Sequence, residues 1–71
     1  MPKRYTPKQI LKTLERFGFY PVSQVGSHMK LRNIEGIVVI VPVNQKVLAV
    51  GTFCSVLRQA KIAKAMFEKQ V

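Results

Sequence analysis

Residues 25–42, VGSHMKLRNIEGIVVIVP, decide the fold of this chain. Polar and apolar side chains alternate over residues 27–33, and residues 37–42 form an apolar, mostly β-branched run. Both patterns favour strands, and the Ile34-Glu35-Gly36 segment between them is short enough for a tight reversal. We therefore predict an antiparallel hairpin that ends at Pro42, since proline cannot continue a ladder of hydrogen bonds.

A third strand is expected just before this hairpin. Residues 19–25 are aromatic, β-branched or polar, and Gly26 after them predicts a turn. Pro21 has no N–H group to donate to a neighbouring strand, so this segment should lie at the edge of a sheet. The sequence thus predicts three antiparallel strands.

A helix is predicted before the strands, over residues 7–17. Its apolar side chains recur at helical spacing, and Gly18 provides a stop signal after it. Thr6 can cap its first turn, and Gln9 stands where a capping box needs Glu or Gln. This helix should place one apolar face against the core.

A second helix is predicted after the strands, over residues 52–60, with Gly51 leading into it and Thr52 as its cap. Residues 61–69 continue the helical spacing, and the pattern leaves open whether they extend this helix or form a third. The order helix, three strands, helix predicts an α+β fold, in one domain over residues 1–71, with both helices on one face of the sheet.

The charge of the chain points to a polyanionic partner. Twelve Lys and Arg residues stand against three acidic residues, which gives a net charge of +9 over 71 residues. Nucleic acid is the commonest such partner, and its binding should weaken steeply with salt. Anionic membrane, an acidic protein and a basic surface kept only for solubility stay open at this point.

Cysteine usage and hydropathy suggest a cytoplasmic protein. The single cysteine, Cys54, excludes an internal disulfide, and no Cys or His cluster has the spacing of a zinc site. Cys54 lies in an apolar run and is expected to be a small buried residue. The longest apolar run, residues 37–43, is too short to span a bilayer, so we expect no membrane segment.

One residue stands out for acid–base chemistry, because the chain has a single histidine, no aspartate and three scattered glutamates. The alternation of residues 27–33 puts His28 on the same strand face as Lys30 and Arg32. Such a face suits RNA cleavage without a metal or other cofactor, since RNA supplies its own nucleophile in the 2′-hydroxyl. A lone histidine is, however, more often a simple surface or core residue.

Two motifs resemble one known family. Gly26-Ser27-His28 looks like the Gly-Ser-His motif of HicA mRNA-interferase toxins, whose strand histidine is catalytic. The stretch GTFCSVLRQA, residues 51–60, is similar to the family's Gly-Thr to Gln-Ala segment, and the resemblance runs from about Thr6 to Ile62. Gly26, Pro42, Gly51 and Thr52 are its structural motif residues.

The resemblance implies a fold like the double-stranded-RNA-binding domain and ribosome-independent cleavage of mRNA. It further implies a HicB-type antitoxin as partner, with His28 as the catalytic residue. We expect Ser27, Lys30, Arg32, Lys3 and Arg4 to contact RNA. Many family members carry a second histidine after the strand-ending proline, whereas this chain has Val43-Asn44 there and so lacks a second proton-transfer group.

The apolar strand 37–42 predicts a covered outer surface. Helices on one side of a sheet cover only alternate residues, which leaves Val38 and Ile40 without a neighbour from that side. An antitoxin or a second copy of the chain could pack there and occlude His28, or the C-terminal segment of the chain itself could fold over this face. A homodimer is therefore one expected state.

Two other functions would explain the charge equally well. The chain could be a non-catalytic RNA-binding module, in which Lys61 and Lys64 grip phosphates, or these two lysines could be a solvated helix face. A basic ribosome-associated or DNA-binding protein is the third possibility, although it gives no reason for a lone histidine on an exposed strand face.

Overall fold

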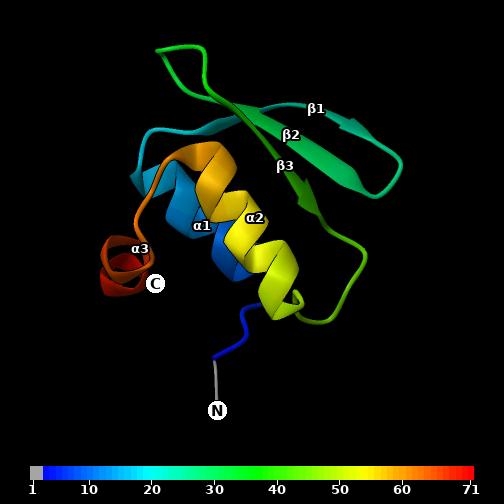
Figure 1. Ribbon diagram of the computed structural model, residues 1–71. Coiled ribbons are helices and arrows are strands. Elements are labelled where there is room, and N and C mark those ends of the chain that lie inside the picture. Colours follow the sequence, from blue (N-terminus) through cyan, green and yellow to red (C-terminus); the bar gives the residue numbers. More distant parts are fainter. Residues whose placement is uncertain (1–2) are drawn as a thin grey trace.

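The computed structural model describes residues 3–71, which form a sheet with helices on one of its faces (Figure 1). Along the chain come α1 (Pro7–Arg16), β1 (Tyr20–Val25), β2 (His28–Arg32), β3 (Val38–Pro42), α2 (Val50–Ala60) and α3 (Lys64–Gln70). The predicted α+β fold class is therefore confirmed. The segment after α2 forms a separate helix, a choice that the sequence left open.

The sheet is antiparallel, in the order β1-β2-β3, so β2 is central and β1 lies at an edge as predicted. Each strand is slightly shorter than expected from the sequence: β1 begins at Tyr20, β2 covers only His28–Arg32, and β3 begins at Val38. The pairing of β1 with β2 shifts between Pro21 and Ser23, where Val22 forms a bulge.

Helix α1 begins as its sequence predicts. The Thr6 hydroxyl accepts a hydrogen bond from the Gln9 backbone N–H at 3.1 Å, and the Thr6 N–H donates to Gln9 Oε1 at 2.9 Å. This capping box satisfies two backbone donors that a helix start leaves free. The helix ends at Arg16, one residue earlier than expected, and Gly18 follows with a φ of +90°.

The predicted start of α2 is wrong. The helix begins at Val50, its N-cap residue Ala49 makes no side-chain capping bond, and Gly51 and Thr52 both lie inside the helix. Leu48 just before it is fully buried, and its N–H donates to the Tyr5 carbonyl at 2.9 Å. This anchor fixes where the chain turns into the helix, so tertiary packing overrides the local capping signal.

The core lies between the sheet and the helices and extends into an aromatic cluster beneath α3. Fully buried residues come from α1, β2, β3 and α2, among them Ile10, Leu14, Leu31, Val39, Val41 and Val56. Phe67 of α3 is also fully buried, with its ring against those of Tyr5, Phe17 and Phe53. Cys54, expected to be buried, is only partly so.

Candidate functional site

The turn between β1 and β2 fixes the position of His28. Val25 pairs with His28 across a two-residue loop, Gly26-Ser27, and Gly26 has a φ of +57°. A left-handed glycine at the first central position is the pattern of type II′ turns, which match the twist of a hairpin. The Gly-Ser-His order thus places the histidine as the first residue of β2.

The helices lie on one side of the sheet (Figure 1), and buried Leu31 faces them. His28 is exposed and has the opposite strand parity to Leu31, so it lies on the other face, which we call the outer face. Its neighbours across the sheet are Val25 on β1 and Pro42 on β3. The missing N–H of Pro42 costs no ladder bond. The Ile40 N–H points away from β2, toward Gln59. In an antiparallel ladder, residues two positions apart point their N–H groups the same way, so an N–H at position 42 would not donate to β2 either.

Two cations continue the row that His28 begins. Lys30 and Arg32 are exposed on the same face of β2, as the alternation of the sequence predicts, while Leu31 between them is buried. Successive residues on one strand face are about 7 Å apart, so Arg32 lies about 13 Å from His28 along the strand. This row could hold successive phosphates of an extended polyanion next to an imidazole.

Apolar side chains flank this row on β3. Val39 and Val41 are fully buried, whereas Val38 and Ile40 remain 38% and 36% exposed. Val38 lies opposite Arg32, and Ile40 lies opposite Lys30. The C-terminal helix α3 packs against α1 on the other side of the sheet (Figure 1), so the described chain does not itself cover these residues.

Not all of the residues predicted to contact RNA lie near His28 in the structure. Ser27 is half-buried in the adjacent turn, and its carbonyl accepts a hydrogen bond from the Val43 N–H at 2.7 Å. Lys3 and Arg4 are exposed in the segment before α1, on the helical side of the molecule (Figure 1). They are therefore separated from the outer face by the sheet and the helices.

The other predicted cations lie elsewhere too. Lys61 is the left-handed residue that ends α2, with a φ of 58°, and Lys64 is the first residue of α3. Both are exposed and belong to the helical side. They could form part of a separate basic surface, but they do not contribute to the face that carries His28.

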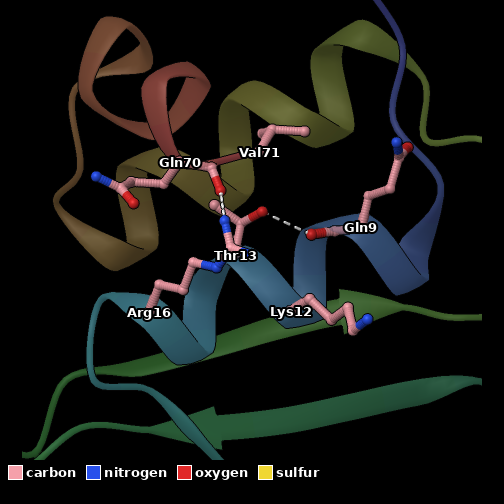
Figure 2. Close-up of a pocket in the computed structure, with 6 residues that line it drawn as sticks. All are labelled: Gln9, Lys12, Thr13, Arg16, Gln70 and Val71. Carbon is pink, nitrogen blue, oxygen red and sulfur yellow. Dashed lines mark hydrogen bonds between the residues drawn. The ribbon is translucent and has the colours of Figure 1, made fainter.

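A shallow pocket of about 110 Å³ lies between α1 and the end of α3 (Figure 2). Figure 2 shows Thr13 turned toward its own helix, where its hydroxyl donates to the Gln9 carbonyl at 2.8 Å. The Arg16 guanidinium donates to the Gln70 carbonyl and so joins the two helices. Lys12 and Val71 complete the lining. This pocket is a helix junction, remote from the outer face.

Sequence reasoning missed two residues. Gln59 lies in the motif stretch of residues 51–60, and its side-chain oxygen accepts the Ile40 N–H, but nothing in the sequence signals that contact. Tyr20 is 45% exposed and lies directly opposite Arg32. Regular strand alternation would place Tyr20 on the inner face, because it does not include the bulge at Val22, which reverses the faces within β1.

Within residues 3–71, no three His, Cys, Asp or Glu side chains gather where they could hold a metal ion. In the same part of the chain, no helix combines the length and the apolar character needed to cross a bilayer.

The outer face and the layers beneath it define a small, basic α+β protein with one imidazole at a strand end beside a row of cations. A family model described as HicA toxin of bacterial toxin-antitoxin matches residues 7–62. The chain belongs to this HicA toxin family. The match runs from α1 to just past α2 and stops before α3. A search of curated proteins found no match.

Proposed function

We propose that this toxin is an endoribonuclease that cleaves mRNA without a metal and independently of the ribosome, with His28 as its catalytic residue. The observation that carries the proposal is the position of His28, exposed at the start of β2 in line with Lys30 and Arg32. An imidazole is the commonest general base in proteins, and cations beside it can hold a phosphodiester. An mRNA substrate would place its action in the cytoplasm.

In the proposed reaction, His28 takes the proton of a 2′-hydroxyl, and the 2′-oxygen then attacks the adjacent phosphorus. The bond from phosphorus to the 5′-oxygen breaks, and that oxygen takes a proton from solvent, since the chain has no second histidine. The products are a 2′,3′-cyclic phosphate and a free 5′-hydroxyl. Lys30 and Arg32 stabilise the extra negative charge that develops on the phosphate oxygens.

The fold supports a protein partner for the same face. Val38 and Ile40 are exposed beside the cations, and contiguous apolar surface of this kind is typical of protein interfaces. We propose that a HicB-type antitoxin packs there and blocks access to His28, with a second copy of the chain as the other possible occupant. Inhibition would then be steric, because the partner and RNA would compete for one face.

The deciding experiment compares wild type with His28→Ala on purified single-stranded RNA in the presence of a chelator. We expect cleavage by the wild type, products with cyclic phosphate ends, and loss of about 100-fold or more in rate for the variant. A substrate with a single 2′-deoxynucleotide at the cleaved position should resist. Lys69→Ala, which removes a cation from α3, is the matched control and should keep the rate.

Equal cleavage by wild type and His28→Ala would overturn the catalytic assignment. A second candidate, a non-catalytic RNA-binding module of the double-stranded-RNA-binding type, rests on the +9 charge and on the exposed Lys61 and Lys64. It would gain support if neither protein cut RNA and both preferred duplex RNA. In that case Lys61→Ala and Lys64→Ala should weaken duplex binding, whereas His28→Ala should not.

A further inference from the structure

The outer face carries an aromatic ring for which the proposed chemistry has no use. Tyr20 begins β1 and is 45% exposed, whereas the other tyrosine, Tyr5, is buried in the core. Tyr20 pairs with Arg32, so ring and guanidinium stand side by side on neighbouring strands, about 5.5 Å apart between Cα atoms. A large exposed ring on an open sheet face needs an explanation beyond folding.

The β1 bulge is what turns this ring outward. Val25 and Ser23 face outward opposite His28 and Lys30, and regular alternation would then put Tyr20 on the inner face. Val22 is unpaired between Pro21 and Ser23, so the alternation shifts by one residue and Tyr20 joins Val25 and Ser23. The bulge therefore aligns Tyr20 with the row of cations on β2.

We propose that Tyr20 is a base-stacking platform for single-stranded RNA, and so a residue that positions the substrate for His28. Exposed aromatic rings on open sheets bind unpaired bases by stacking, and adjacent cations hold the backbone between them. An RNA strand that follows β2 would meet His28, Lys30 and Arg32 in turn, with one base on Tyr20. The inference rests on the proposed ribonuclease function.

Charge favours RNA over a protein as the occupant of this corner of the face. Every charged side chain on the outer face of the three strands is basic, and Tyr20 adjoins Arg32. Stacking requires a base that is free of its duplex partner, so the platform selects single-stranded substrate. The ring lies about 13 Å from His28 along the strand direction, which means that the stacked base is separated from the cleaved bond.

Fluorescence can test the stacking without any cleavage. The chain has no tryptophan, so Tyr20→Trp in a His28→Ala background creates a single indole reporter at this position. We expect strong quenching of its emission on addition of oligouridylate or oligoadenylate, and little quenching with duplex RNA. As a reference, Met66→Trp in the same background places the indole on an exposed position of α3, where RNA should not quench it.

Affinity measurements complete the test. Tyr20→Phe keeps the ring and should bind single-stranded RNA like the parent. Tyr20→Ile keeps apolar area and strand propensity but removes the ring, and should lose about 5- to 150-fold in affinity. In a series of oligonucleotides with an abasic site at successive positions, binding should weaken at one position. That position should be displaced from the cleaved bond, and the weakening should occur only when Tyr20 is present.

The outcomes separate the two proposals. Cleavage that depends on His28, with equal RNA affinity for Tyr20→Phe and Tyr20→Ile, would overturn the stacking role and leave the ring for a protein partner. Quenching at Tyr20→Trp together with cleavage unaffected by His28→Ala would overturn the catalytic assignment of His28 and leave the stacking role intact.

Discussion

Gln59 of α2 is hydrogen-bonded to the free edge of β3: its Oε1 accepts the Ile40 N–H at 2.9 Å. The same amide donates from Nε2 to the Ser55 hydroxyl at 3.3 Å, which holds it in place one helical turn away. An edge strand that shows its unpaired N–H groups is a template for another chain. Gln59 therefore joins the helix to the sheet and blunts this edge at the same time.

Gln59→Ala should reduce the free energy of unfolding by about 1 kcal/mol, because one backbone hydrogen bond at the sheet edge is lost. Urea unfolding measures the effect, and chromatography should reveal any new association through the β3 edge. Gln45→Ala changes an exposed glutamine of the loop before α2 and should be neutral. Equal stability of the two variants would contradict the role given to Gln59.

The two motif glycines should respond in opposite directions to alanine. At Gly26, with a φ of +57°, a side chain has open space but an unfavourable backbone, so Gly26→Ala should destabilise by about 1 to 2 kcal/mol. Gly51 lies inside α2 with open space around it, and Gly51→Ala should stabilise by up to about 1 kcal/mol. Thermal unfolding of both variants checks the signs.

Phe67→Ala should destabilise the fold severely, by about 3 to 5 kcal/mol, since it empties the centre of the aromatic cluster. In a domain of this size such a loss removes most of the stability. The adjacent Met66 is 52% exposed, and Met66→Ala should cost little. Similar midpoints for the two variants in urea would mean that α3 is not anchored through Phe67.

Alkaline pH should weaken the fold through Tyr5. The pKa of Tyr5 is raised above its usual value of 10.0, first by burial of the phenol and then by the hydrogen bond from Tyr5 to Glu68 at 2.8 Å. As pH rises, the unfolded chain loses the Tyr5 proton before the folded chain does. The contribution of Tyr5 to the free energy of unfolding is therefore complete below about pH 10 and is lost as pH rises through the folded-state pKa. Tyr5→Phe should show a smaller loss between about pH 8 and pH 11 in urea unfolding.

The cations of β2 should determine the salt dependence of RNA binding. For single strands, each phosphate contact contributes about 0.7 to the slope of log K against log salt concentration. Lys30→Gln and Arg32→Gln should each reduce the slope by about that amount. Lys69→Gln removes the same charge from α3 and should leave the slope unchanged. The same reduction in all three variants would indicate a diffuse charge effect instead of contacts on the outer face.

Much of the architecture follows from local sequence patterns. The alternation around His28 predicts which side of β2 is exposed, because the period of a strand is fixed at two residues. The capping box of Thr6 and Gln9 predicts the first turn of α1, since the two residues that bond to each other are only three positions apart in the sequence. Contacts of this range need no knowledge of the rest of the fold.

Other features depend on contacts between distant segments. The sequence by itself determined the hairpin, the first helix and the exposed row of His28, Lys30 and Arg32. Only the tertiary structure decided that α2 begins at Val50, where buried Leu48 is anchored to Tyr5, and that the β1 bulge turns Tyr20 toward Arg32. The physical reason is that pairing register and burial are set by the neighbouring element, which the local pattern does not contain.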